Sequence, residues 1–575
     1  MIHVPDDAKE LLVLANELIE QCKVSVGMRA AYCRLMNSIS ETGRYDGTKS
    51  LINLLYKHID RTAAHLFSPV ELKFHLDFER RYNKKIYAQG DVVAQVLTRQ
   101  WERNGTDVRF GRGVFESLKY GACIHKQWVQ DEGANSHPVY YDKLVMPWQF
   151  GVYNESENNI NMQPALLETS TITLPQVWRR IYHLPNARKL FERVRSHAMS
   201  GTAVSDPQSF FHQVLSTSQL NTGVQGATRP LPGGIVQLNN DPNYSIMGPQ
   251  VSAPVVTVHE LWVQDDEDYT TIIMIEPDII VAPLMKKQNL LVKGSQLQPY
   301  RLIQPNEVTN WFWGRSELVD LIEPQGLLSV WLDDMRRLTG LQVDKILGFV
   351  GETGMTDEMY AAGRMAGFFN VGQGSSIQDL TPKMPPELLG NIKFLIETIN
   401  NLSGFPPIMQ GAGEPGVRAG VHASTLLKTA SPTLRDRALL VERQCAVTAD
   451  LTLSIREAKD AEFWWTESED PIKSTEESKF LISELPDDWR VTVDSHSSSP
   501  IFADDNEQRV YAAHKMGVVD GDYVIDNTAL PNKDKAHLSL KEKQKRSAEM
   551  MQKLLAENPE IGEKLALKQI TGGKR

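Results

Sequence analysis

The stretch GAGEPG, residues 411–416, matches the G-x-G-x-x-G spacing of a turn that binds the pyrophosphate of a dinucleotide. Its glycines are Gly411, Gly413 and Gly416. Such a turn needs a strand directly before it and a helix directly after it. The preceding residues instead predict a helix at about 386–402 and then Pro406-Pro407, and Pro415 removes a backbone N–H from the motif. We therefore predict a flexible loop between helices, and keep a nucleotide-binding enzyme as the weaker alternative.

Other enzyme signatures are incomplete or missing from the sequence. GRYDGTKS, residues 43–50, comes nearest to a phosphate-binding P-loop, but Thr48 separates the glycine from the lysine that must follow it directly. A helix, and not a strand, is predicted before it. No H-E-x-x-H or G-x-S-x-G motif occurs, and the 14 histidines lack metal-ligand spacing. We predict that the protein is not an enzyme and holds no cofactor or metal.

The four cysteines form no C-x-x-C pair and fit no zinc spacing. They are Cys22, Cys33, Cys123 and Cys445. We predict buried reduced thiols in a cytosolic setting. No apolar run approaches the roughly 18–20 residues that a membrane span needs. The start of the chain does not resemble a secretory signal, so we expect the protein to stay in the compartment where it is made.

Charge and length narrow the class of protein further. The 575 residues are enough for several domains, and the net charge is −11 with a pI near 5.8. An acidic chain does not favour tight binding of nucleic acid, because such binding depends on basic side chains that neutralise the phosphates. It remains compatible with a protein that lets nucleic acid pass without holding it.

Hydrophobic periodicity predicts a mixed, mainly helical α+β fold. In the first half we expect helices within 6–66, mixed helix and strand over 85–130 with a turn at 103–113, long loops at 200–252, and an antiparallel meander at 255–263, 270–275 and 279–284. In the second half we expect a stem-like helix up to 342, with Pro324 kinking or restarting it, a Gly-rich insert of strands and a short helix at 343–383, and a helix at 386–402. A long helix at 422–460 broken at Ser431-Pro432, a strand at 488–494 and helices from 503 onward complete the pattern.

This order of helix, compact insert, helix, loop and long helix resembles the portal proteins of tailed bacteriophages, the head-to-tail connectors. Two stretches carry the resemblance: WFWGRSELVDLIEPQGLLSVWLDDMRRL at 311–338 and VRAGVHASTLLKTASPTLRDRALLVERQ at 417–444. Portal sequences often have an aromatic-Gly-x-Ser step into a stem helix, and Trp313-Gly314-Arg315-Ser316 is that step here. The resemblance is most specific over about 300–460, and the first 250 residues add little to it.

The resemblance implies a ring of twelve subunits around a DNA channel, at one vertex of the capsid in the virion, assembled in the host cytoplasm. The genome would be packaged and ejected through this channel. Mapped onto the chain, it implies a wing at 1–312 with extended loops at 200–252, a stem helix at 313–342, a clip at 343–383, a second stem helix at 384–405, a tunnel loop at 406–421, a long wing helix with returning strands at 422–500, and a crown at 501–575. Another structural component of the capsid or tail connector is the alternative.

The resemblance also implies two sets of contact residues and several partners. The tunnel loop would contact passing double-stranded DNA without sequence specificity, through Gln410, Gly411, Gly413, Glu414, Gly416, Arg418 and His422. The clip would dock the terminase large subunit and the tail adaptor protein, through Glu352, Asp357, Glu358, Arg364 and Gln373. The major capsid and scaffolding proteins would be further partners, and no membrane is expected.

Overall fold

We describe a computed structural model of residues 1–575. The described residues are 2–44, 49–69, 72–130, 139–199, 230–231, 235–236, 255–265, 268–282, 298–343, 347–350, 358, 376–402, 432–457, 462–466, 477–493, 510–526, 536, 539–540, 542–543 and 545–546. The chain divides into two compact units, Met1–Val493 and Asp494–Arg575, which are described separately.

The described elements mix helix and sheet, which confirms the predicted α+β class. The helices of the first unit are α1 (Ala8–Thr42), α2 (Leu55–Leu66), α3 (Lys84–Asn104), α4 (Thr106–Tyr120), α5 (Leu174–Ile181), α6 (Ala187–Met199), α8 (Ile322–Val343), α10 (Leu388–Leu402) and α12 (Pro432–Glu457). The strands are β1 (Phe74–Phe78), β2 (Cys123–Gln130), β3 (Val139–Val145), β4 (Phe150–Val152), β5 (Ala165–Thr173), β6 (Pro230–Leu231), β7 (Ile235–Val236), β8 (Val255–Asp265), β9 (Asp268–Ile275), β10 (Ile279–Ala282), β11 (Tyr300–Ile303), β12 (Leu347–Val350), β13 (Ser376–Asp379), β14 (Glu462–Thr466), β15 (Glu477–Leu481) and β16 (Trp489–Val493). In the second unit, 510–515 is helical and α14 spans Gly521–Asp526.

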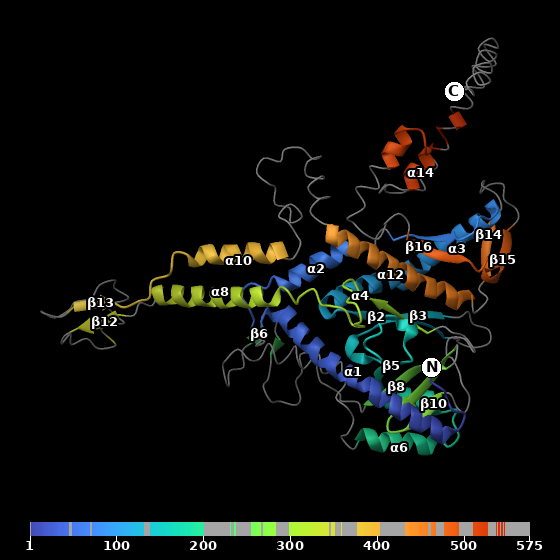
Figure 1. Ribbon diagram of the computed structural model, residues 1–575, viewed down its shortest axis with the longest axis horizontal. Helices are drawn as coiled ribbons and strands as arrows, with labels where there is room; N and C mark the ends of the chain where they lie inside the picture. The colour runs from blue at the N-terminus through green and yellow to red at the C-terminus, as the bar shows by residue number, and fades with distance from the viewer. Residues whose placement is uncertain are drawn as a thin grey trace, which may run out of the picture. The chain divides into compact units, whose positions relative to one another are not determined.

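The long helix α1 packs against a five-stranded antiparallel sheet, as Figure 1 shows. The sheet order is β10-β9-β8-β5-β4, and its β8–β9–β10 part confirms the predicted meander. Asp7 caps α1, because its Oδ2 accepts from Lys9 N at 3.1 Å and Glu10 N at 3.3 Å. Every third or fourth residue of α1 is apolar and joins a core with the sheet, through Leu11, Ala15, Leu18, Ile19, Leu167, Leu261, Val263 and Ile272.

A three-stranded sheet, β11-β2-β3, faces the larger one through a buried layer of charges. Lys126 Nζ donates to Glu168 Oε2 and to Glu260 Oε1, each at 2.7 Å. Lys143 also pairs with Glu168, and Tyr300 Oη donates to Glu168 Oε2 at 2.9 Å. Burial alone would raise the pKa of Glu168, but the two lysines outweigh it and hold that pKa below its usual range.

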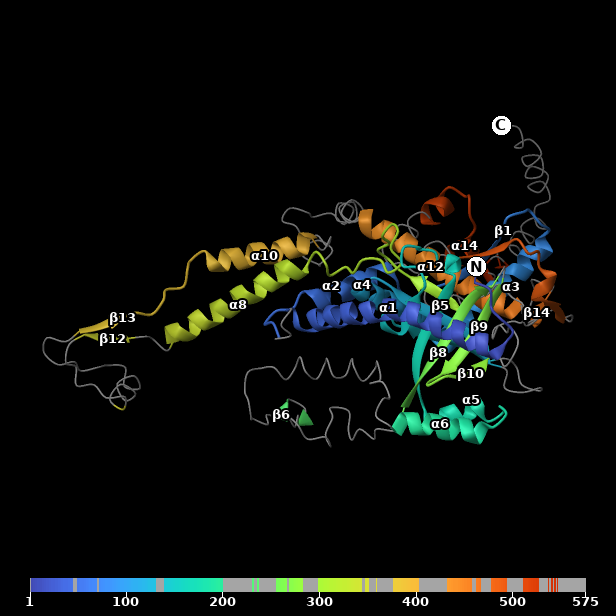
Figure 2. The ribbon, with the colours of Figure 1, turned by 60° about the horizontal axis from the view of Figure 1, so that its bottom comes forward.

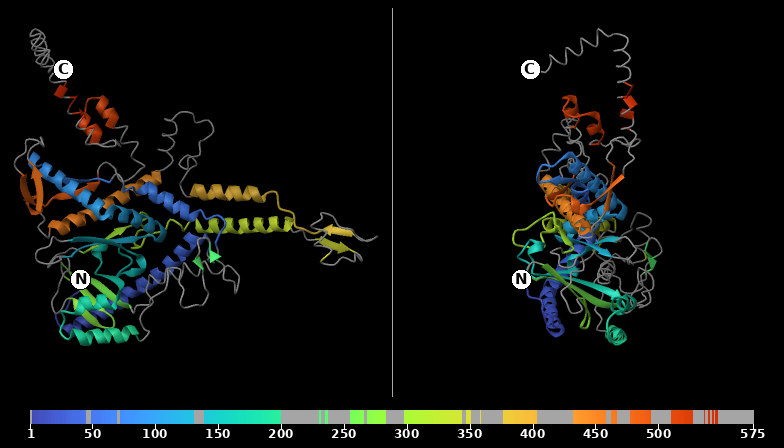
Figure 3. Two further views of the ribbon diagram at one scale, coloured as in Figure 1. Left: turned by 180° about the vertical axis from the view of Figure 1, so that it is seen from behind. Right: turned by 90° about the vertical axis from the view of Figure 1, so that its right-hand side faces the viewer.

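Helices α8 and α10 lie side by side and run in opposite directions, and all three ribbon views agree on this (Figures 1, 2 and 3). The antiparallel strand pair β12–β13 lies at the end of α8 and the start of α10. Helix α8 begins at Ile322, and Pro324 lies in its first turn, where the backbone N–H has no partner within the helix. Pro324 therefore starts the helix and does not kink it. The predicted helix at 386–402 and the strand in KILGFVG are confirmed.

Two segments more than 400 residues apart form the sheet β1–β16, in which Phe74 pairs with Val493 and Phe78 with Trp489. The predicted strand at 488–494 is confirmed, but its partner was not predicted. The hairpin β14–β15 was also missed. Helix α12 lies against β16 and also contacts α2 and β2, so the second half of the chain packs on the first.

The predicted turn at 103–113 is wrong, because only Gly105 breaks the helix there. Gly105 has φ +64° and separates α3 from α4. Two further glycines lie inside α4, where they permit close packing: a Cβ on Gly113 would lie 2.6 Å from Ile303 Cδ1, and one on Gly111 would lie 3.3 Å from Phe67 Cδ1. The sequence pattern did not distinguish packing glycines from turn glycines.

All four cysteines are free and buried, as predicted. Other predictions fall partly or wholly outside the described residues. The loops at 200–252 lie outside the described residues except for β6 and β7, and so does 422–431 of the long helix. Within the described ranges, no helix is both long and apolar enough to cross a membrane.

Replacing Glu168 by glutamine should lower the free energy of unfolding by about 3 kcal/mol, because the buried Lys126 then keeps Glu260 as its one carboxylate partner and Lys143 loses its partner. The measurement is the urea midpoint of the full chain. Glu20→Gln is the matched control, since its pair with Lys23 at 3.6 Å is exposed, and its cost should stay below about 0.5 kcal/mol. Equal midpoints for the two variants would contradict the stabilising role of the charge layer.

Candidate functional site

The segment directly before α8 is held by a close backbone contact between two glycines, Gly314 and Gly121. Gly314 has φ +65° and Gly121 has φ +94°, conformations that disfavour a side chain. A Cβ on Gly314 would lie 2.7 Å from Asn306 O and 2.8 Å from Gly121 O, while one on Gly121 would lie 2.7 Å from Trp313 O. The glycine of the Trp313-Gly314-Arg315-Ser316 step is therefore required for this close approach of two backbones.

The neighbours of Gly314 hold the same segment to the core of the first unit. Trp313 is fully buried, and its Nε1 donates to Glu155 Oε1 at 2.8 Å. Ser316 Oγ donates to Lys119 O at 2.7 Å, and the backbone N–H of Glu317 donates to Leu118 O at 2.9 Å. These bonds tie the start of the predicted stem to the end of α4.

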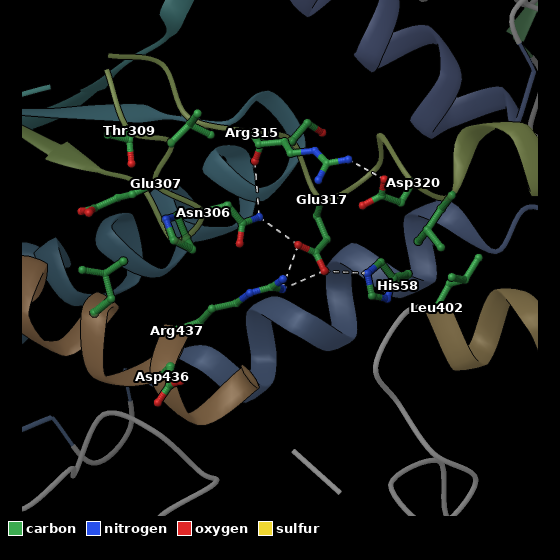
Figure 4. Close-up of a pocket in the computed structure, with 15 residues that line it drawn as sticks. His58, Asn306, Glu307, Thr309, Arg315, Glu317, Asp320, Leu402, Asp436 and Arg437 are labelled. Carbon is green, nitrogen blue, oxygen red and sulfur yellow. Dashed lines mark hydrogen bonds and ion pairs between the residues drawn. The ribbon is translucent and has the colours of Figure 1, made fainter. Parts of the chain in front are cut away.

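Glu317 is the centre of the site, as Figure 4 shows. Its carboxylate accepts from Arg437 Nη1 at 2.8 and 2.9 Å and from Asn306 Nδ2 at 2.8 Å, and His58 Nε2 lies 3.2 Å away. Burial would raise the pKa of Glu317, but the His58 hydrogen bond and the Arg437 charge outweigh it and lower that pKa to about 2. One carboxylate thus joins α2, the approach to α8, and α12.

These residues line a pocket of about 690 Å³. Its wall includes Leu402, the last residue of α10, and Asp436 in the second turn of α12. The chain therefore leaves for the predicted tunnel loop, and returns from it, at this pocket. Arg315 and Asp320 form an exposed ion pair at its rim.

The pocket is not arranged for catalysis by the groups described in it. Ser316 donates its hydroxyl to a backbone carbonyl, and the Glu317 carboxylate is held ionised by its donors. Neither is placed as a nucleophile or a general base. Across the described part of the chain, no group of three or more His, Cys, Asp or Glu side chains is arranged to hold a metal ion.

The stretch that resembled a P-loop has a structural role at its two described ends. Helix α1 ends at Thr42, directly before Gly43, so a helix precedes the stretch as predicted. Arg44 Nη2 donates to Ser329 O at 2.9 Å, and Ser50 Oγ lies 2.8 Å from Ser329 Oγ. Both ends therefore contact the first turns of α8.

Most of the predicted contact residues lie outside the described residues, namely Gln410, Gly411, Gly413, Glu414, Gly416, Arg418 and His422 of the tunnel loop, and Glu352, Asp357, Arg364 and Gln373 of the clip. Glu358 of the clip is described, and it is exposed and helical. Their DNA-contacting and docking roles stay predictions. Helix α10 ends at Leu402, and the GAGEPG motif with the residues directly before it lies outside the described residues.

Sequence reasoning missed Glu317, Arg437 and His58. Glu317 and Arg437 are 120 residues apart, and Glu317 and His58 are 259 apart. The one local signal is a charged residue, Glu317, between the Gly-x-Ser step and an apolar run. Neither a comparison with protein-family models nor one with curated proteins finds a match to this chain, so its function is argued from geometry.

Replacing Gly314 by alanine should cost about 1–3 kcal/mol of unfolding free energy, because it combines a positive φ with a backbone clash. Gly326→Ala is the matched control, since a Cβ there meets nothing within 4 Å in the first turns of α8. That control should be neutral or stabilising by up to about 1 kcal/mol. Urea unfolding of both variants tests the pair, and equal costs would disprove the close-approach role of Gly314.

Replacing Glu317 by glutamine should lower the free energy of unfolding at pH 7 by about 3 kcal/mol, because the carboxylate whose pKa is depressed to about 2 is lost and the half-buried Arg437 is left without its partner. Asp320→Asn, at the exposed pair with Arg315, is the control and should change little.

The same variant should also lose part of the acid sensitivity of the fold. The folded pKa of Glu317 is depressed to about 2, so its stabilisation is present above its ordinary pKa of 4.5 and is lost as the pH falls through 2. Urea midpoints measured from pH 7 down to pH 2.5 should therefore converge for wild type and Glu317→Gln. Parallel curves would contradict this assignment.

Proposed function

We propose that this chain is a portal-type subunit, a non-enzymatic protein whose copies form a ring around a double-stranded DNA channel at one capsid vertex of a virion. The observation that carries the proposal is the antiparallel pair α8 and α10, with β12–β13 at its far end and α12 directly after residues 403–431. This order agrees with a stem of two helices, a clip between them, and a tunnel loop followed by a wing helix. Twelve copies, terminase and tail-adaptor docking, and contacts with capsid and scaffolding proteins belong to the same proposal.

Exposed apolar side chains on α1 support assembly from several copies. Val24, Gly27, Met28, Ala31 and Leu35 recur every three or four residues, so they form one face. Val24 is 63% exposed and Met28 56% exposed. A contiguous apolar face of this kind is typical of a protein–protein contact. We call these five residues the α1 seam.

The site around Glu317 gives this proposal a mechanical basis. A tunnel loop at 406–421 would be held at one end by α10 and at the other by α12. The bidentate pair of Arg437 with the buried Glu317 carboxylate fixes α12 to the segment before α8, so force on the loop would be transmitted to the stem through this ion pair. The acidic net charge of −11 per chain would let the duplex slide, with Arg418 making weak, transient phosphate contacts.

Electron microscopy of the purified chain should show rings with a central hole. Deletion of 411–420 should leave these rings intact while DNA packaging or retention falls, because the loop is proposed to touch DNA and not to hold the ring together. Arg418→Ala should have a milder effect, since the loop contacts are many and weak. Chains that stay monomeric under all assembly conditions would rule out the proposal, and rings lost on deletion would make the loop a structural connection.

A further inference from the structure

The face of α8 turned away from its core contacts carries apolar side chains near the wing. Leu327 is 44% exposed and Val330 is 52% exposed, and Asp334 and Arg337 continue the same face at helical spacing. The buried residues of α8 lie on another face, at Ile322, Gln325, Leu328, Ser329 and Leu332. The exposed side is therefore not needed to build the subunit.

Helix α10 has a comparable exposed face around Phe394, which is 67% exposed. Lys393 and Glu397 flank this ring and are exposed as well. The buried residues Ile392, Leu395 and Ile399 lie on the other side of the helix. A phenylalanine left this open on a helix would gain about 1.5–3 kcal/mol of burial against a partner.

The charges on the two faces are complementary. Exposed charges in the outer half of α8 are two arginines and one aspartate: Arg336, Arg337 and Asp334. Exposed charges on and just before α10 are two glutamates and one lysine: Glu387, Glu397 and Lys393. None of these six pairs with another residue in the described part of the chain, although Lys393 and Glu397 have the i,i+4 spacing for a pair within one helix. The α8 set therefore has a net charge of +1 and the α10 set a net charge of −1, so the two sets are complementary.

We propose that the exposed face of α8 in one copy packs on the exposed face of α10 in a second copy. This contact buries Leu327 and Val330 from one copy and Phe394 from the other. Because α8 and α10 run in opposite directions, Arg337 of the first copy, seven residues after Val330, then lies near Glu387 of the second, seven residues before Phe394. Two different faces meet, so the contact is heterologous and propagates around a closed ring. The inference rests on the proposed ring, and it names the surface that holds neighbouring subunits together.

Charge exchange tests this contact. Arg337→Glu and Glu387→Arg should each place like charges together and raise the protein concentration for half-assembly by about tenfold. The double variant restores opposite charges and should return to within about threefold of wild type. Phe394→Ser should weaken assembly in every background. Ring formation is measured by analytical ultracentrifugation, and urea midpoints show that each variant is folded.

Arg179→Glu on α5 is the matched control, because it makes the same charge change at another exposed site, and its assembly should equal that of wild type. Single variants that assemble like wild type, or a double variant no better than the singles, would overturn the α8–α10 contact. In that case wild-type rings would still support the portal proposal, and the α1 seam would be the next surface to test. A wild-type chain that forms no rings would overturn both.

Discussion

The three-stranded and five-stranded sheets of the first unit each carry a pair of like charges that the other sheet neutralises. Lys126 lies opposite Lys143 across β2 and β3, and Glu168 lies opposite Glu260 across β5 and β8. Like charges directly across a strand pair destabilise a sheet, so neither sheet is satisfied alone. When the two sheets stack face to face, the lysines of one pair with the glutamates of the other. These ion pairs favour one relative position of the two sheets. The fold of the first unit depends on this constraint.

The position of the site around Glu317 depends on this layer of lysines and glutamates. Phe312 and Trp313 belong to the same core as Trp262 and Tyr300, and Leu451 of α12 joins it from the far side. The backbone after Trp313 is then fixed by the contact between Gly314 and Gly121 and by the hydrogen bonds of Glu317, which set the direction of α8. The path from the charge layer to the proposed stem is a series of short, buried, direct contacts. Such a series couples the direction of α8 to the stacking of the two sheets.

The sequence predicted elements whose signal is local, and missed those whose signal is not. Strong periodicity located α1 and α10, and β-branched runs located β8, β9 and β10. The turn placed at 103–113 was wrong because Gly111 and Gly113 let α4 pack closely on Phe67 and on the sheet residues Ile303 and Leu144, which no spacing along the chain reveals. The site around Glu317 was missed for the same reason, since its three segments are far apart in the chain. The tunnel-loop residues, including Arg418, stay predictions.

The pairing of β1 with β16 has a consequence for how the protein is made. Strand β1 ends at Phe78, and its partner begins at Trp489, so β1 leaves the ribosome more than 400 residues before β16 exists. During that time its backbone edge is open to any other strand in the cell. Synthesis at about 5–20 residues per second makes this interval tens of seconds long. A newly made chain therefore exposes the edge of β1 until Trp489 to Val493 have been translated, and a product that ends before Trp489 would keep that edge unpaired.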